Sequence, residues 1–526
     1  MSTLASYAPP PHTAQTWRVT KPAARGRRGI VASQARAAAE VGVAVLEAGG
    51  NAVDAAVAAG FALAAVEPWN SGLGGIGFAL VHPAGAPAAQ MVDFGPVAPA
   101  GLDPEKFRLT GRETSDGFAW PEVEGDLNLH GALSVAIPST VAGYHAMHAR
   151  WGRLPIAELL APAIALARRG LPQDWYTTLM IASTAAGLRL YPESARIYLA
   201  DGLPPVPPYR GDAPHFALGA LPATLEHLQR AGLSDFYEGD VAAALVADIA
   251  EAGGVLSAED LRACRARIAP ASAAPWRGRV LQYAGGLTAG PTLARVLAAL
   301  PPPASAAPDA GWFGTLAAAL RAAYAARLEG EGAANPDGGC TTHLTVCDAA
   351  GGMVALTSTL LSTMGSKLVL PKIGVLMNNG VMWFDPRPGR PNSIAPGRRP
   401  LTNMCPVILR EGDAPVLAAG ASGGRRILAS VLQMLTFVAD FGMDPEAAAH
   451  HPRIDVSGPD LILADRRLDA DVLAALHAAG PTLTAEHAVQ PGNFACPNLV
   501  LARPDGQRVG VSDALSPWSA ALAEPG

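Results

Sequence analysis

The stretch GGCTTHLTVCD, residues 338–348, places a cysteine, two threonines and a histidine at the end of a glycine-rich loop. Cys340 is a candidate nucleophile, and a Cys/His pair is a candidate metal site. Thr341 is a third candidate, because a threonine hydroxyl can use its own α-amino group as a base once the chain is cut before it. An α-amine has a pKa of about 7.7–8.0, so a usable fraction of it is neutral near pH 7. We therefore favour Thr341.

Chain cleavage at this point needs only the hydroxyl itself. Thr341 Oγ would attack the Cys340 carbonyl carbon, form an ester, and leave water to release the new N-terminus. The loop EGEGAANPDGGC, residues 329–340, is rich in turn formers and has no hydrophobic periodicity, so it is a suitable place for such a cut. The same hydroxyl would then attack amide substrates.

A hairpin is predicted to position this threonine. HLTVCD and MVALTSTL are short β-rich runs on either side of AAGG. A three-residue loop sets Thr341 opposite Thr359, and a four-residue loop sets Thr342 opposite Thr359. Opposed residues have Cβ atoms about 4.5–5.5 Å apart, and Thr357 lies on the same strand face. We expect three hydroxyls to converge here, although a threonine-rich strand face with no chemistry is the alternative.

A second nucleophile candidate is Ser422 in GASGG, residues 420–424. The surrounding sequence predicts strand, turn and helix, as a nucleophile elbow requires, but no Asp and His partners can be singled out. A glycine-rich turn that enters a helix can instead hold an oxyanion on its free N–H groups. We favour the oxyanion role.

Two further patterns do not indicate ligand sites. Gly72, Gly74 and Gly77 have G-x-G-x-x-G spacing, but a helix precedes them and a strand follows, the reverse of a dinucleotide fold. His450 and His451 are adjacent, and adjacent residues do not share a helix face. We expect no nucleotide site, no metal and no organic cofactor.

Composition narrows the class of protein. The 526 residues carry a net charge of -6 and no Lys/Arg run, which argues against nucleic-acid binding. Five cysteines without C-x-x-C spacing argue against a disulfide framework. No signal-peptide core and no apolar run of membrane-spanning length is evident, so we expect a cytoplasmic protein with no membrane contact.

The elements expected along the chain begin with a loose arm over residues 1–28. Helical patterns cover 35–66, broken at Gly49 and Gly50 with Asn51 as the cap of the second helix, and they return later. The later helical stretches are 137–170, broken at WGRLP, then 220–252, 312–328 and the run RILASVLQMLTFVADFG, while PVILR and VGVSD indicate strands.

Several blocks of the sequence, taken in order along the chain, resemble the γ-glutamyltransferase family of N-terminal-nucleophile hydrolases. The resemblance covers most of the chain and is collinear. Its blocks are GIVASQARAAAEVGVAVLEAGGNAVDAAVAAGFALA with GLGGIGF, HGALSVAIPSTVAGYHAMHARWGRLPIAELLAPAIALARRG, TTHLTVCDAAGGMVALTSTL, LMNN, RRPLTNMCP and AGASGGRRI.

The resemblance implies an α+β fold, a four-layer αββα sandwich made as one precursor. Cleavage before Thr341 would leave a large subunit of residues 29–340 and a small subunit of 341–526, which stay associated. Thr341 matches the nucleophile and Thr359 the threonine that hydrogen-bonds it. Gly423 and Gly424 match the backbone oxyanion pair, and the family needs no cofactor.

The substrate side departs from the family pattern. Thr402 and Asn403 stand in the place of paired serines that hold a substrate carboxylate. The family's clamp for the glutamyl α-carboxylate and α-ammonium uses Arg, Asn, Gln and Asp, and here those positions read Gly95, Leu361, Gly380 and Trp383. Each lost charge-assisted hydrogen bond costs about 1.5–3 kcal/mol. Tight binding of a γ-glutamyl group is therefore not expected.

We accordingly predict an amidohydrolase that applies this threonine chemistry to a small-molecule amide with a different acyl group. Trp383 is the candidate apolar wall, Thr357 is counted with the substrate-binding positions, and Arg425 or Lys367 is the candidate carboxylate ligand. The alternatives are a true γ-glutamyltransferase or glutathione hydrolase, a Ser422 hydrolase, and an unprocessed relative without catalysis.

Overall fold

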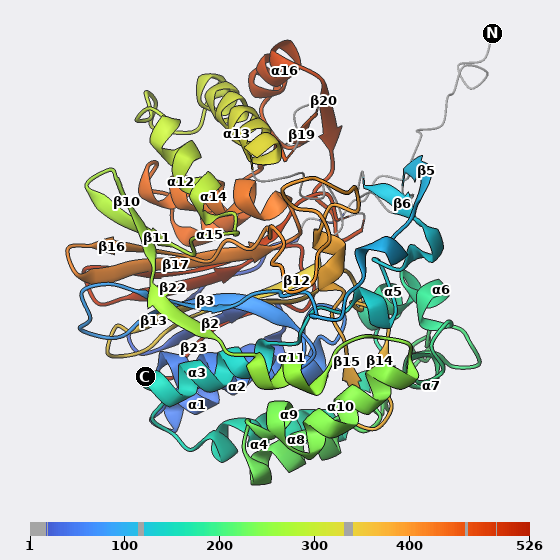
Figure 1. Cartoon of the computed structure of the whole chain (residues 1–526). Coiled ribbons are helices and arrows are strands. Elements are labelled where there is room, and N and C mark those ends of the chain that lie inside the picture. Colours follow the sequence, from blue (N-terminus) through green and yellow to red (C-terminus); the bar gives the residue numbers. More distant parts are fainter. Residues whose placement is uncertain (1–16, 18, 114–119, 331–339, 458–460, 491) are drawn as a thin grey trace.

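Two seven-stranded antiparallel sheets form the centre of the computed structural model, which describes residues 17, 19–113, 120–330, 340–457, 461–490 and 492–526 (Figure 1). The first sheet has the order β1 (Ala24–Gly26), β22 (Arg508–Ser512), β21 (Cys496–Ala502), β17 (Ala414–Ser422), β16 (Val407–Glu411), β11 (Arg279–Tyr283) and β10 (Ser272–Trp276). The second has the order β23 (Ala520–Ala523), β2 (Ile30–Ser33), β12 (Cys340–Cys347), β13 (Met353–Leu361), β3 (Ile76–His82), β4 (Gln90–Phe94) and β9 (Arg267–Pro270).

Helices cover the outer face of each sheet (Figure 1). Over the second sheet lie α1 (Arg36–Glu47), α2 (Ala52–Val66) and α3 (Thr140–Trp151), with α4 (Ile156–Arg169), α8 (Leu221–Ala231) and α10 (Asp240–Glu251) outside them. Over the first sheet lie α12 (Gly290–Ala299), α13 (Ala310–Gly330), α14 (Arg426–Ala439), α15 (Pro445–His450) and α16 (Ala470–Ala479). The order helix, sheet, sheet, helix confirms the expected four-layer α+β sandwich.

The predicted helix breaks are confirmed where the sequence carries a capping signal. Asn51 begins α2: its side chain accepts hydrogen bonds from the backbone N–H groups of Val53 and Asp54, and Asp54 closes the capping box. Every residue of α2 is buried, because α1 and α4 pack on it while it covers the second sheet. A helix that is apolar all round belongs in such a position.

Alternation along the strands divides the core into separate apolar clusters. In β13, Val354 and Leu356 point to the helices, whereas Met353 and Ala355 point to the space between the sheets. The odd-numbered residues of β13 therefore face the first sheet, and these include Thr357 and Thr359. The threonines predicted to do chemistry thus lie on an inner face of the sandwich.

The C-terminal end of the expected 1–28 arm belongs to the fold. Residues 1–16 and 18 lie outside the described part of the chain, but Ala24–Gly26 form β1 and pair with β22. Lys21 Nζ donates hydrogen bonds to the carbonyl oxygens of Asp513, Ser516 and Ser519. The Pro- and Ala-rich composition did not reveal this segment's strand, because its partner is 484 residues away in the chain. No helix in the described ranges is long and apolar enough to cross a membrane.

Candidate active site

Thr341 lies in a β-bulge at the start of β12. Thr342 pairs with Ser358, but Cys340 pairs with Leu361, so the register slips by one residue at Thr341. A bulge re-aims the side chain that it contains. Thr341 Oγ1 donates a hydrogen bond to Thr359 Oγ1 at 3.3 Å, and Thr359 Oγ1 also accepts one from the backbone N–H of Leu361 at 2.8 Å. The predicted neighbourhood of Thr341 and Thr359 is confirmed.

The three-residue loop is the correct alternative for the hairpin. Asp348 N donates to the carbonyl oxygen of Gly352 at 3.0 Å, and the register from Thr342 to Cys347 follows from it. Asp348 accepts further bonds from the backbone of Gly352 and of Ala52, at the start of α2. The hairpin turn is therefore hydrogen-bonded to the start of α2, which fixes the position of the hairpin relative to the helix layer.

Thr357 does not join the other two hydroxyls. Its Oγ1 is hydrogen-bonded to His343 Nδ1 at 2.8 Å. His343 is fully buried, and burial lowers its pKa to about 3, so the ring is neutral. The ring fills the space between the sheets: a Cβ on Gly420 of β17 would lie 2.2 Å from it. His343 is thus a packing residue, and the Thr357 hydroxyl is its hydrogen-bond partner.

That contact also locates the glycine-rich turn. His343 is two residues after Thr341, and Gly420 is three residues before Gly423, so both reach the same end of the sandwich. Gly423 and Gly424 have φ of +132° and +62°, conformations that favour glycine, and a Cβ on Gly423 would be 2.8 Å from Ala495 Cα. The chain then enters α14, which begins at Arg426 directly after the turn.

Ser422 lies at the end of β17 with the local geometry of an elbow, but its surroundings do not supply a base. Its Oγ accepts a hydrogen bond from the Gln34 amide, and among the described residues no histidine is hydrogen-bonded to it. Arg425 follows the glycines and is buried; its Nη1 donates to the Ser457 carbonyl at 3.2 Å, and its own carbonyl accepts from Tyr324. Both residues stabilise the turn.

The remaining substrate-binding candidates are also engaged in the fold. Thr402 Oγ1 donates to the Leu287 carbonyl at 3.0 Å, and Asn403 is buried beside it. Trp383, in the short 3-10 helix Gly380–Trp383, is 3% exposed and belongs to the apolar cluster between the sheets. Lys367 Nζ donates to Ser362 Oγ and to the carbonyls of Thr363 and Gly365.

At Gly95, where the family has an arginine, the space beside the backbone is occupied by the side chains of Arg399 and Phe78. Gly95 follows Phe94, which pairs with Gly77, so it lies beside Ile76 on the same row as Thr359. A Cβ on Gly95 would be 2.7 Å from Arg399 Nη2 and 2.4 Å from the Phe78 ring. Arg399 is held by an ion pair with Asp93. A second arginine, Arg267, also contacts Asp93 at 3.3 Å. Residue 95 has no room for a longer side chain.

Sequence reasoning missed three residues that contact candidate site residues or their neighbours: Gln34 at Ser422, Arg399 at Gly95 and Glu67 at Thr342. Glu67 is buried at the end of α2 and accepts a hydrogen bond from Thr342 Oγ1 at 2.6 Å. One signal was available, since Glu67 is an acidic residue at the end of an otherwise apolar run, AVAAGFALAAVEP. Its partner could not be read from the sequence, because 275 residues separate the two.

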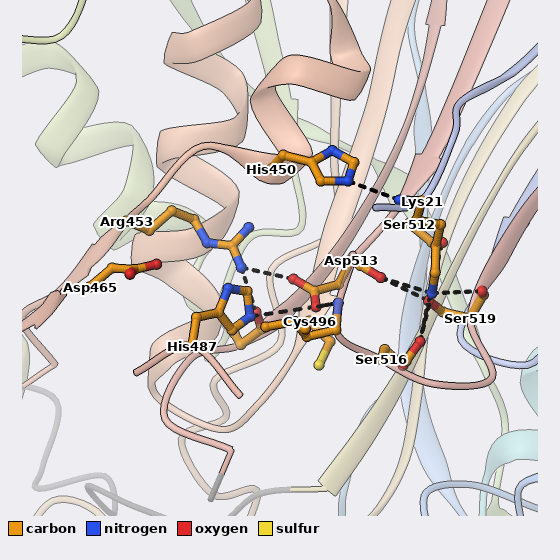
Figure 2. A network of polar contacts seen from close by, with 12 residues as sticks. Lys21, His450, Arg453, Asp465, His487, Cys496, Ser512, Asp513, Ser516 and Ser519 are labelled. Atoms are coloured by element: carbon orange, nitrogen blue, oxygen red, sulfur yellow. Dashed lines mark hydrogen bonds and ion pairs between the residues drawn. The ribbon is translucent and has the colours of Figure 1, made fainter. Parts of the chain in front are cut away.

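Behind the glycine turn lies a buried polar network, shown in Figure 2. Arg453 Nη2 donates to Asp513 Oδ2 at 2.8 Å and to the Ala495 carbonyl at 3.3 Å. Asp513 also faces His487, at 3.5 Å, and its backbone carbonyl accepts from Lys21. Because Ala495 abuts Gly423, this network supports the turn through Ala495. Within the described chain, no group of three His, Cys, Asp or Glu could hold a metal ion.

Comparison with known proteins relates this geometry to a family. The family model described as gamma-glutamyltranspeptidase matches residues 38–329 and 319–522, which is most of the chain. The chain belongs to the gamma-glutamyltranspeptidase family. The fold is similar to that of cephalosporin acylase from Bacillus halodurans, which superimposes with a TM-score of 0.83 at 22% identity, covering 98% of this chain and 99% of that one.

Two curated relatives are similar to nearly the whole chain. Acylase ACY 1 proenzyme from Pseudomonas sp. (strain SE83) is 30% identical over 96% of this chain and 95% of its own length. Glutathione hydrolase proenzyme from Escherichia coli (strain K12) is 28% identical over 93% of this chain and 90% of its own. Family membership makes this chain an enzyme, an N-terminal-nucleophile amidohydrolase or acyltransferase that processes itself.

Proposed function

We propose that this protein cleaves itself before Thr341 and then hydrolyses a small-molecule amide through an acyl-threonine intermediate. The observation that supports this most directly is the hydrogen bond between Thr341 and Thr359 inside the bulge of β12. The bulge is where the described strand begins after the 331–339 segment. Thr359 Oγ1, fixed by the Leu361 N–H, orients the Thr341 hydroxyl.

Maturation and catalysis use the same oxygen atom. In maturation Thr341 Oγ adds to the Cys340 carbonyl carbon, the Cys340–Thr341 amide bond breaks, and the proton passes to the leaving nitrogen. Water then hydrolyses the resulting ester, which leaves a carboxylate on Cys340 and a free α-amine on Thr341.

In turnover that α-amine takes the Oγ proton while Oγ attacks the substrate amide carbonyl. The backbone N–H groups of Gly423 and Gly424 are proposed to hold the oxyanion, and the leaving amine receives the proton. Water next attacks the acyl ester, and this step regenerates Thr341. An amine in place of water would give acyl transfer instead.

We propose an acyl group other than γ-glutamyl. Gly95, Leu361, Gly380 and Trp383 offer no charged clamp, and three of them border apolar neighbours: Leu361 and Trp383 lie in the cluster with Ile76 and Met382, and a Cβ on Gly380 would meet Ala136 at 2.7 Å. The similarity to an acylase proenzyme supports an acyl group other than γ-glutamyl, whereas the similarity to glutathione hydrolase proenzymes favours a γ-glutamyl substrate. The γ-glutamyl alternative is therefore kept as the rival substrate class.

A panel of chromogenic amides tests the proposal. We expect faster hydrolysis of an acyl p-nitroanilide that lacks an α-amino group than of γ-glutamyl-p-nitroanilide. Thr341→Ala should abolish turnover, and Ser422→Ala should retain at least a tenth of it. Activity that survives Thr341→Ala and is lost in Ser422→Ala would overturn the proposal in favour of a Ser422 hydrolase.

The compartment is a separate proposal. Cys264, Cys347, Cys405 and Cys496 are all free thiols, and burial raises the pKa of the Cys405 thiol to about 12. Thiols that stay unpaired suit a reducing environment such as the cytoplasm. Fractionation of the producing cells, with a cytoplasmic marker enzyme as the reference, checks this.

A further inference from the structure

Glu67 lies directly behind the first residues of β12. It follows the last residue of α2 and is 2% exposed. Thr342 Oγ1 donates to its Oε2 at 2.6 Å, and Asn70 Nδ2 donates to its Oε1 at 2.8 Å. Each carboxyl oxygen thus has a donor, an arrangement that suits a carboxylate.

The turn that carries Glu67 holds both strands of the active site. Thr342 follows Thr341 in β12, and the Leu360 N–H, next to Thr359 in β13, donates to the Asn70 carbonyl at 2.9 Å. Residues 67–70 are therefore hydrogen-bonded to each strand one residue away from a catalytic threonine. The separation of Thr341 and Thr359 depends on these two hydrogen bonds.

Other ionisable groups near Glu67 are neutral or paired. Cys496 of β21 faces it, and burial raises the pKa of that thiol. Beyond Cys496 lie the Arg453–Asp513 ion pair, with His487 on the same carboxylate, and Lys21, whose Nζ is bound by backbone carbonyls (Figure 2). On β12 itself His343 is neutral near pH 7.

We infer that Glu67 is a positioning residue for the nucleophile, which holds Thr341 through Thr342 and places a buried negative charge within about 10 Å of the α-amine that cleavage exposes. This inference rests on the proposed function. Covalent geometry puts the Thr341 nitrogen within about 10 Å of Glu67 Oε2, because only two residues and one hydrogen bond separate them.

A carboxylate at this distance favours the protonated amine. At an effective dielectric constant of about 20, the attraction raises the pKa of the α-amine by roughly one unit. Burial raises the pKa of Glu67 to about 7, which is below that of the α-amine, so Glu67 is already charged in the pH range in which the amine loses its proton. The amine then remains a strong enough base to take the proton of Thr341 Oγ.

The test compares variants in which cleavage at Thr341 has been verified by terminal sequencing. Glu67→Gln removes the charge, and Glu40→Gln, an exposed glutamate of α1, is the matched control. We expect Glu67→Gln to move the acidic limb of the kcat/KM profile down by roughly one pH unit, with Glu40→Gln unchanged. Glu67→Asp should keep the limb but lower kcat. Thr342→Ser should match the wild type, and Thr342→Val should lower kcat more than it changes KM.

Superimposable pH profiles for wild type and Glu67→Gln would overturn the inference. If Glu67→Gln alone fails to mature while Glu67→Asp matures, the requirement for charge is supported. If both fail while Thr342→Val matures normally, the hydrogen bond is dispensable and the inference is overturned. A wild-type protein without a terminus at Thr341 would instead refute the proposed function.

Discussion

At the residue scale, the site consists of two hydroxyls supported by backbone and by one buried histidine. Strand alternation and a three-residue loop placed Thr341 beside Thr359 from the sequence alone, because these depend on local geometry. The expected convergence of Thr357 failed for a tertiary reason: its hydroxyl is bonded to His343, whose ring fits only because residue 420 of the other sheet is glycine. Nothing local to either strand indicated this.

His343 should make the protein sensitive to acid. Its pKa in the folded chain, about 3, is below the unfolded value of 6.5, so its contribution to stability is present above pH 6.5 and is lost as the pH falls toward 3. We expect the wild type to lose more unfolding free energy between pH 7.5 and 4.5 than His343→Phe does. Urea unfolding at both pH values measures this, and equal losses would contradict it.

Gly95 leads to a second prediction at this scale. Restoring the family's arginine with Gly95→Arg should not increase γ-glutamyl turnover, because its Cβ would fall within 2.4 Å of Phe78 and 2.7 Å of Arg399. We expect lower turnover of every amide and a lower melting temperature. Gly314→Ala in α13, where a Cβ has open space, is the control for added side-chain volume. A selective gain in γ-glutamyl-p-nitroanilide hydrolysis would refute this account of the pocket.

At the element scale, β12 connects the two sheets and contacts the helix layer over the second sheet. Thr342 reaches α2 through Glu67, His343 packs on β17, and Thr345 Oγ1 donates to Asn498 of β21 at 2.9 Å. The α1–α2 pair, α14 and the hairpin were predictable, because caps and alternation are local signals. The bulge at Thr341 and the contacts of Glu67 were not, since both depend on partners distant in the chain.

Gly420→Ala tests the packing between the sheets. The added Cβ would lie 2.2 Å from the His343 ring, so the ring or β17 must move. We expect a loss of several kcal/mol of unfolding free energy, typical of overpacking in a rigid core, together with slower self-cleavage. Gly314→Ala again serves as the control. Wild-type stability and cleavage in Gly420→Ala would show that this contact does not hold the nucleophile in place.

At the scale of the whole molecule, residues on both sides of Thr341 build one structure. The cluster beneath the second sheet contains Val57 and Leu63 of α2 together with Leu344 and Leu356 of the hairpin. The second sheet also combines strands from both sides of Thr341: β12 and β13, which follow the cut, lie between β2 and β3, which precede it. A cut before Thr341 therefore removes no strand from its sheet.

We accordingly expect the two chains to remain together after cleavage. Mature protein should elute from size exclusion as one species that separates into two bands only on a denaturing gel. Thr341→Ala is the uncleaved control and should elute at the same volume. Dissociation of the bands under native conditions would show that the shared core is insufficient.

The central claim is that Thr341 becomes a chain terminus and then acts as the nucleophile. N-terminal sequencing of the smaller band from mature protein measures this most directly. We predict the terminus TTHLTV, lost in Thr341→Ala and retained in Ser422→Ala. A fully active protein that stays a single uncleaved chain, or one whose smaller band begins elsewhere, would contradict it.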